Sequence, residues 1–362
     1  MLIRVLLSNF QLFCAKSNPN LLFMKLSKLL FPIALLVIFV STTGRVMAQE
    51  EARAEVTTLY NSAQELAQSA NYDRAIELFE QTLEQADAAG LQDIRQLVVG
   101  QLPRVYSARA ATAYRAFQST KSVANVDAAI AAFQDALAAG ETYGDANAAA
   151  QAANAIPQLI YAKSIVQFSA GDLQASSATL DEALAANPNY AQAMYQKGIV
   201  SRRLEEDVNT TVGYFEQAIA LADATGRGNI AGNARTQAVE TLLFAAVPLA
   251  EERQFQASIA LLERAVALGT NSADVHYRMA EVQNKRSEYR SAIEHAELAL
   301  EYESGGVVDK AKIYFELGLA HQMLNQRDEA CAALKNAAYG DFRDPAQYKM
   351  EFELKCPGVG GN

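Results

Sequence analysis

Apolar positions recur with helical spacing along almost the whole chain from Gln49 onward. They return every three or four residues, and no stretch keeps the apolar–polar alternation of a half-buried strand. The breaks between these stretches are short and polar, and only 8 prolines interrupt the 362 residues. The pattern therefore predicts an all-α protein made of consecutive helices.

A short motif recurs within this pattern: a small residue, a bulky residue four positions later, and a small residue three positions after that. The first copy contains Ala75 and Phe79. The later copies, one with alanine at the bulky position, are Ala129, Phe133, Ala136; Ser176, Leu180, Ala183; Thr211, Phe215, Ala218; Ser258, Leu262, Ala265; Ala292, Ala296, Ala299; and Ala330, Leu334, Ala337. Small residues let two helices approach closely, and the bulky residue fills the space beside them. The seven copies predict seven stacked helix pairs.

These residues resemble the tetratricopeptide repeat (TPR), a helix-turn-helix unit of about 34 residues. Gly198 and Gly318 match the small residue at position 8 of that repeat, and Pro188 matches the proline at position 32. The family's tryptophan is absent from every copy, so the resemblance rests on the set of copies. It covers roughly 52–342 and implies a TPR-like helical-repeat solenoid.

Three segments lengthen the spacing between repeats: 88–109, 139–156 and 222–238. Each opens with a glycine-containing turn and then returns to helical spacing, which predicts an extended first helix in the following repeat. The solenoid is predicted over 49–343. Residues 344–362 are predicted to form a capping helix, started by Pro345, and a glycine-rich tail, because a solenoid needs its last apolar face covered.

Residues 1–48 have the pattern of a secretory signal peptide. Lys25 and Lys28 precede a 12-residue apolar run, and compact residues end the segment at Ala48. A membrane-spanning helix needs about 20 apolar residues, so cleavage after Ala48 is favoured over a retained single-span anchor. Met24 begins this pattern, and residues 1–23 are attributed to an upstream start codon. The pattern predicts an exported protein, periplasmic or secreted, of a bacterial envelope.

Removal of this segment makes the chain more acidic. The full sequence has 31 Lys and Arg against 41 Asp and Glu, and the signal segment contains five basic residues and no acidic ones. The mature chain would keep 26 basic and 41 acidic residues, a formal charge of −15. Such a surface repels phosphate backbones and anionic lipids, which argues against nucleic-acid binding and membrane binding after cleavage.

Two cysteines, Cys331 and Cys356, remain once Cys14 leaves with the signal segment. An even pair in an oxidising compartment predicts a disulfide that ties the last repeat to the C-terminal segment. Two buried free thiols are the alternative.

In TPR proteins the first helices line a concave groove, and position 5 of the repeat points into it. This position lies 15 residues before the small residue of the second helix (16 for Tyr195), and the resemblance assigns it to Tyr60, Tyr114, Tyr161, Tyr195, Leu243, Tyr277 and Phe315. A row of aromatic rings suits a bound peptide or helix, and it also suits stacking on sugars. Packing between first helices is the alternative, and a tyrosine can do both.

Polar residues flank this row at neighbouring groove positions. They are Gln158, Gln192, Arg202, Arg203, Asp274, Glu281, Asn284, Lys285, Lys312 and Gln322. Family members that clamp a C-terminal carboxylate use Lys, Arg and Asn, and Arg202 and Arg203 with Asn284 or Lys285 are the candidates here. A solvated helix face is the usual alternative.

No catalytic motif accompanies these features. His276, His295 and His321 lack metal-ligand spacing, and the sequence has no nucleophile elbow or phosphate-binding glycine loop. We therefore expect no enzyme, no cofactor and no metal. The predicted function is an exported scaffold that binds an envelope or secreted protein or peptide in its groove; a carbohydrate-binding accessory factor is the alternative.

Overall fold

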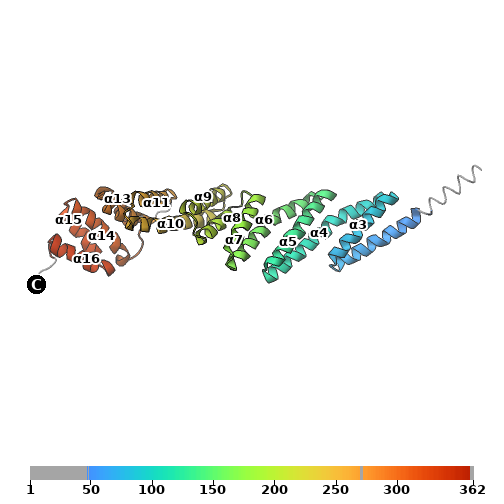
Figure 1. The fold of residues 1–362 in the computed structure, drawn as a ribbon, viewed down its shortest axis with the longest axis horizontal. Coiled ribbons are helices and arrows are strands. Elements are labelled where there is room, and N and C mark those ends of the chain that lie inside the picture. The colour runs from blue at the N-terminus through green and yellow to red at the C-terminus, as the bar shows by residue number, and fades with distance from the viewer. Residues whose placement is uncertain (1–46, 48, 270–271, 359–362) are drawn as a thin grey trace, which may run out of the picture. The chain divides into compact units, whose positions relative to one another are not determined.

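The computed structural model describes residues 47, 49–269 and 272–358. Almost all of the predicted signal segment lies outside the described residues, so the signal stays a prediction. Helices are the only regular elements in the described part of the chain, as the apolar spacing predicts. The fold is therefore all-α (Figure 1).

The helices form seven successive pairs, which confirms the predicted number of repeats. The first pair is the helix over 49–68 with α3 (Tyr72–Ala89). The others are α4 (Gln92–Thr120) with α5 (Val123–Tyr143), α6 (Ala146–Ser169) with α7 (Leu173–Ala186), α8 (Ala191–Arg203) with α9 (Val208–Ala224), α10 (Gly228–Glu251) with α11 (Phe255–Ala267), α12 (Ala273–Lys285) with α13 (Tyr289–Tyr302), and α14 (Val307–Met323) with α15 (Arg327–Ala337).

The predicted solenoid comprises two compact units. One contains residues up to Ser119 together with Ala128–Ala153, and the other contains Thr120–Asp127 together with the chain from Asn154 onward. The N-terminal unit therefore holds the first helices up to the start of α6. The C-terminal unit holds most of α6 and all the helices after it.

The recurring motif forms the core of each repeat. The first small residue of every copy is at most 1% exposed: Ala75, Ala129, Ser176, Thr211, Ser258, Ala292 and Ala330. Gly198 and Gly318 show how closely the paired helices approach. A Cβ atom on Gly198 would lie 2.6 Å from the Phe215 ring, and one on Gly318 would lie 2.7 Å from Cγ of Leu334. Both repeats have no space for a larger residue at position 8.

Three helix pairs have the extended first helices that the sequence predicts. Helices α4, α6 and α10 have 29, 24 and 24 residues, whereas α8 and α12 have 13 each. The second helix before each long one is lengthened too: α3, α5 and α9 have 18, 21 and 17 residues. Gly90, Gly144 and Gly226 adopt positive φ at the intervening turns, a conformation that favours glycine.

A C-terminal cap covers the last repeat, as predicted. A 3₁₀ turn (Gly340–Phe342) leads into α16 (Arg343–Tyr348), which continues as a π-helical turn (Lys349–Glu353). Ala346, Met350 and Cys356 pack against Leu334 and Ala337 of α15. The cap therefore begins slightly before Pro345 and is not a regular α-helix throughout.

The structure links the cap to α15 by a disulfide between Cys331 and Cys356, whose Cα atoms are 5.8 Å apart. This is the pair that the sequence analysis predicts. The bond closes a segment of 25 residues that includes the whole cap.

Candidate partner-binding groove

First helices of successive repeats contact one another in the C-terminal unit: α10 packs beside α12, and α12 packs beside α14. Two depressions lie on the face that these three helices share. Each is lined by residues from corresponding positions of neighbouring repeats, and both include Glu281 and Lys285 of α12. We call this surface the first-helix groove; it is formed by Val247, Glu251, Arg278, Glu281, Asn284, Lys285, Glu316, Leu319 and Met323.

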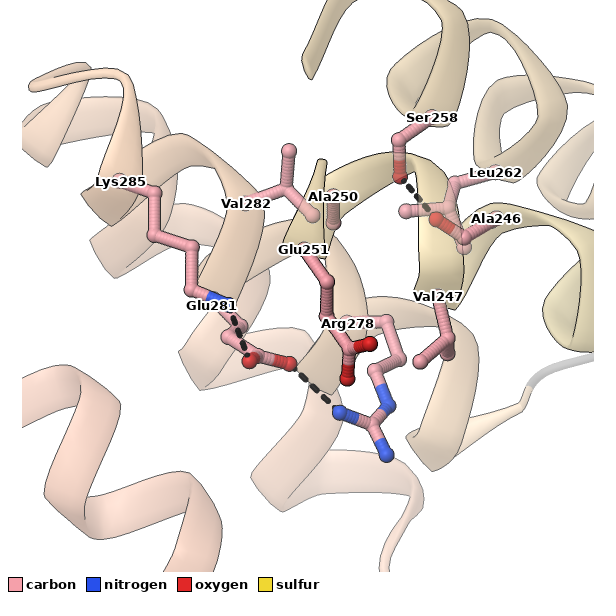
Figure 2. Close-up of a pocket in the computed structure, with 10 residues that line it drawn as sticks. All are labelled: Ala246, Val247, Ala250, Glu251, Ser258, Leu262, Arg278, Glu281, Val282 and Lys285. Atoms are coloured by element: carbon pink, nitrogen blue, oxygen red, sulfur yellow. Dashed lines mark hydrogen bonds and ion pairs between the residues drawn. The ribbon is translucent and has the colours of Figure 1, made fainter. Parts of the chain in front are cut away.

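The depression between α10 and α12 is nearly filled by side chains (Figure 2). Its free volume is about 20 Å³, which admits little more than one water molecule. The Ser258 hydroxyl donates a hydrogen bond of 2.8 Å to the carbonyl of Ala246 at its base. This part of the groove offers a contact surface and no pocket.

The depression between α12 and α14 is much larger, with a volume of about 300 Å³. This volume is at the lower end of the range for small-ligand sites. It combines polar and apolar walls: Glu281, Asn284, Lys285, Tyr289, Glu316, Leu319 and Met323.

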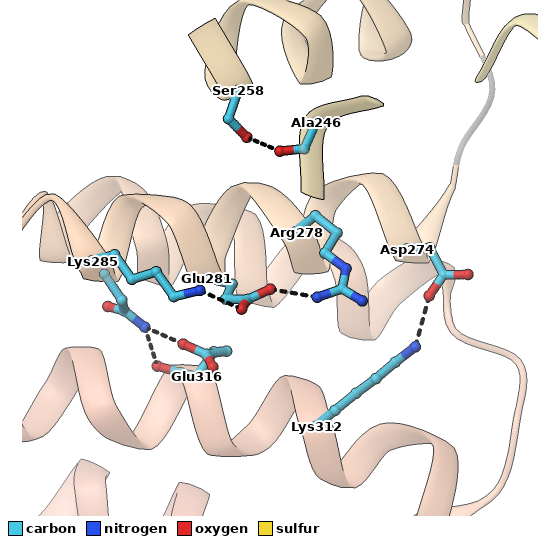
Figure 3. A network of polar contacts seen from close by, with 9 residues as sticks. Ala246, Ser258, Asp274, Arg278, Glu281, Lys285, Lys312 and Glu316 are labelled. Carbon is cyan, nitrogen blue, oxygen red and sulfur yellow. Dashed lines mark hydrogen bonds and ion pairs between the residues drawn. The ribbon is translucent and has the colours of Figure 1, made fainter. Parts of the chain in front are cut away.

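A chain of ion pairs runs along α12 (Figure 3). Glu281 accepts hydrogen bonds of 2.7 Å from Lys285 and 2.6 Å from Arg278. Burial by itself raises the pKa of Glu281, but these two cations outweigh it and hold the pKa below its usual value. Lys312 of α14 reaches across to Asp274 of α12 at 2.7 Å. The pairs of Glu281 lie within α12, and the Lys312–Asp274 pair links α12 to α14.

Glu316 is the buried acid of this site, with 8% of its surface exposed. The Asn284 side-chain amide donates to a Glu316 carboxylate oxygen at 2.8 Å and to the Glu316 backbone carbonyl at 3.0 Å. Burial raises the pKa of Glu316, and the Asn284 hydrogen bond opposes this only in part. The sequence analysis named Asn284 and did not name Glu316.

In the N-terminal unit, two members of the predicted aromatic row differ in exposure. The ring of Tyr60 packs edge-on against Phe79 at 5.7 Å, within its own helix pair. Tyr114 is 39% exposed, and its ring lies 6.4 Å from Phe117. The groove role predicted for both stays a prediction, with Tyr114 the more accessible.

In the C-terminal unit the row is largely engaged in internal contacts. Rings of Tyr161 and Tyr190 are 5.4 Å apart, those of Tyr195 and Phe215 are 6.0 Å apart, and Phe315 lies 5.2 Å from a ring of the cap. Stacking on a sugar needs an open ring face, so these contacts do not favour the carbohydrate alternative.

Tyr277 belongs to the core, the alternative that the sequence analysis left open. It is 8% exposed, and the cationic groups of Arg278 and Lys312 lie 5.0 and 4.9 Å from its ring centre. Burial, with a further effect of the Glu281 charge, raises the pKa of Tyr277 to about 12. A partner has little access to this ring.

The structure does not assemble the predicted carboxylate clamp. Arg202 pairs with Glu240 of α10 at 3.5 Å, and the Arg203 guanidinium lies 5.9 Å from the centre of the Phe168 ring. Asn284 and Lys285 donate to Glu316 and Glu281 instead. Each of these groups contacts a different partner inside the protein, and no contact in the described residues brings Arg202 or Arg203 together with Asn284 or Lys285.

The sequence analysis did not name several groove residues. Only their position in the repeat, and no motif, marks them in the sequence. Counting from Tyr277 and Phe315 at position 5, Arg278 and Glu316 occupy position 6, and Leu319 and Met323 occupy positions 9 and 13. Phe244 is at position 6 of the preceding repeat and is 86% exposed. It lies one turn from Val247, so both project from the same face of α10.

Two of the three histidines form a pair, and neither lines the two depressions. Nδ1 of His276 and Nδ1 of His295 are 2.9 Å apart, and the two rings are stacked. His276 also contacts the ring of Tyr302. Within 47, 49–269 and 272–358, no group of three or more His, Cys, Asp or Glu side chains is placed to hold a metal ion.

In the described residues, no helix has the combined length and apolar character that crossing a bilayer requires.

No protein-family model matches the chain, and no curated protein matches its sequence. Solved structures superpose on it loosely. The crystal structure of the MamA protein is 22% identical and covers 55% of this chain and 96% of its own, with a TM-score of 0.34. YrrB, described as a TPR protein with an unusual peptide-binding site, is 17% identical (54% and 91% covered, TM-score 0.32). The TPR domain of P58(IPK) is 13% identical (83% and 99% covered, TM-score 0.29).

The repeat architecture itself rests on the seven helix pairs and their buried motif residues. The fold is a TPR-like helical-repeat solenoid.

Proposed function

We propose that this protein is an exported interaction scaffold that binds a segment of an envelope or secreted protein along the first-helix groove. The observation that carries the proposal is the pair of adjoining depressions at corresponding repeat positions, joined through Glu281 and Lys285. A partner segment that follows the groove meets the same helix positions in consecutive repeats. No catalytic role is part of the proposal.

Two exposed apolar side chains support a protein partner. Phe244 is 86% exposed on the α10 side of the groove, and Met323 is 54% exposed on the α14 side. Large aromatic and thioether side chains in such positions supply much of the contact energy at protein interfaces. They suit an occupant that contacts α10, α12 and α14 together.

One feature of the sequence and one of the structure support the compartment. Lys25 and Lys28 with the apolar run that follows have the pattern of an export signal, and Cys331 and Cys356 lie at disulfide distance. N-terminal sequencing of the protein recovered from its native cell tests this part of the proposal. We expect the recovered chain to begin at Gln49. A recovered chain that still contains Lys25 and Lys28 would show that the signal is not cleaved and would contradict this part of the proposal.

Capture of the partner tests the groove. The purified protein serves as bait in an extract of the native cell, beside a Phe244→Ala/Met323→Ala variant. The matched control is Leu97→Ala/Tyr348→Ala, which removes two exposed side chains of similar size from α4 and α16. All four side chains are exposed, so thermal unfolding should be nearly unchanged in both variants.

We expect the groove variant to lose the captured protein and the control variant to keep it. Equal capture by both variants would show that the partner binds elsewhere, and the proposal would be wrong. Capture that is lost only in the control variant would direct the search to α4 or α16.

A further inference from the structure

The groove between α12 and α14 presents hydrogen-bond acceptors that lack donors. The side-chain nitrogen of Asn284 is fixed because both of its contacts, the carboxylate and the backbone carbonyl of Glu316, are acceptors. The side-chain oxygen of Asn284 therefore faces the other way. It is buried and has no hydrogen-bond partner in the described part of the chain.

Glu316 also has an unused acceptor. One carboxylate oxygen receives the Asn284 hydrogen bond, and the other has no hydrogen-bond partner among the residues that the structure describes. This second oxygen is not among the buried atoms without a partner, so an occupant of the groove that brings an N–H group can bind it, and a charged donor gives the stronger hydrogen bond.

Apolar side chains stand beside these acceptors. Leu319 and Met323 lie three and seven positions after Glu316, on the same face of α14. Tyr289 of α13 completes the wall. An occupant that reaches Glu316 therefore passes along apolar surface first.

The charges of the lining favour a cation. Glu281 is already paired with Arg278 and Lys285, and these contacts leave Glu316 as the acid without a cationic partner. A carboxylate in the groove would be repelled by Glu316, and Lys285, the cation of this lining, is already paired with Glu281. The full chain has a net charge of −10, which attracts basic segments at longer range.

Lysine and arginine side chains have the required combination of an apolar stem and a cationic donor group. We propose that the groove between α12 and α14 binds a lysine or arginine side chain of the partner segment, with the unpaired carboxylate oxygen of Glu316 as its acceptor. This inference rests on the proposed function and specifies the partner: an extended segment that carries a basic residue at the position facing Glu316.

A hexapeptide library tests the inference, using the intact protein and peptides that are acetylated and amidated so that no terminal charge contributes. We expect lysine and arginine to be enriched at one position of the bound peptides. Replacing that residue with norleucine, which keeps the stem and removes the charge, should weaken binding about tenfold or more, as expected for one hydrogen bond to a charged group.

A Glu316→Gln variant completes a double-mutant cycle with the norleucine peptide. The glutamine still accepts from Asn284, so the fold should be retained, and the basic peptide should bind about tenfold more weakly. The norleucine peptide should bind the variant and the native protein equally. Glu263→Gln, on the exposed face of α11, is the matched control and should change neither affinity.

Each result separates the two proposals. Peptides that bind without a basic preference, and that lose affinity in the Phe244→Ala/Met323→Ala variant, would overturn this inference and leave the groove as the binding surface. An equal loss for basic and norleucine peptides in Glu316→Gln would also overturn it. If no peptide binds the native protein, both proposals are wrong. If Glu316→Gln unfolds, the inference is still tested by comparing the basic and norleucine peptides on the native protein, and equal affinity for the two would overturn it.

Discussion

The extended pair α4–α5 and the compact repeats around α12–α14 have the same core motif. They differ in the contacts made by the helix surfaces outside that motif. The cluster that joins α4 to α5 contains the buried alanines Ala110, Ala132 and Ala136, and Arg109 pairs with Asp73 at 3.2 Å and also with Asp135. Around α12–α14 the neighbouring first helices exchange hydrogen bonds and enclose a groove. The larger of the two depressions thus lies between first helices of compact repeats, and the long helix α10 borders only the smaller one.

The motif residues are the constrained part of the repeat. The small and bulky motif residues contact each other inside one helix pair, so they recur in both regions. The residues at positions 6, 9, 12 and 13 face the next repeat and change from pair to pair. Function should therefore respond to substitutions at those positions, and stability should respond to the motif.

Loss of the disulfide is expected to have the largest effect, and it should act on the compact end alone. Cys331→Ala/Cys356→Ala removes a link that closes 25 residues and should lower the free energy of unfolding by about 3 kcal/mol on the chain-entropy model. Hydrogen exchange would show faster exchange in α15 and the cap, with α4 and α5 unchanged. Equal exchange in α15 before and after the substitution would contradict this.

Gly318→Ala should have the next largest effect on the free energy of unfolding. The added Cβ would lie 2.7 Å from Cγ of Leu334, a branched atom in the packed core, so helices α14 and α15 must separate. Overpacking of this kind costs about 1–3 kcal/mol. Chemical denaturation measures it, and an unchanged midpoint would mean that the two helices are less closely packed than described.

The same substitution in the extended region should have the opposite sign. A Cβ on Gly100, in the middle of α4, meets nothing within 4 Å. Gly100→Ala removes a helix-destabilising residue and should raise the free energy of unfolding by about 0.5–1 kcal/mol. A loss of stability in this variant would break the comparison, since it would place a close contact on the free face of α4.

A pH-dependent effect should be confined to the compact repeats. Burial lowers the pKa of both His276 and His295 below the ordinary 6.5, while the charge of Glu294 opposes the shift of His295. The unfolded chain then binds more protons than the folded one as the pH falls below 6.5, so stability is complete above that pH and declines beneath it.

Thermal unfolding between pH 7.5 and 5 measures this decline. A His276→Gln/His295→Gln variant is the control and should lose the part of the pH dependence that comes from the pair. If the native protein and the variant have the same profile, the histidines do not contribute to it.

The sequence predicts the core well because its contacts are local. The motif residues of one copy lie on one face of a single helix, and their partners are on the helix just before it, as with Gly198 and Phe215. The extended first helices were also predictable, since helical spacing resumes directly after the glycine turns. The lengthening of α3, α5 and α9 was not predicted, because an added helical turn at a C-terminus leaves the motif register unchanged.

The groove was predictable only in outline. Register placed Tyr277 at a groove position, but its ring is covered by Arg278 and Lys312, and the latter comes from the next repeat. Glu316 resembles any acid on a solvated helix in the sequence. Its burial depends on Asn284, which lies 32 residues earlier. Contacts of this range follow from the stacking of repeats, which a single-repeat pattern does not specify.

The most direct test of the central claim is site-specific photocrosslinking in the native cell. A photoreactive residue would replace Val247 or Met323 in the first-helix groove, and Glu263 or Val266 on α11 in the controls. We predict that both groove positions crosslink to the same partner protein and that the α11 positions do not. Crosslinking of that partner from α11, with none from the groove, would contradict the account.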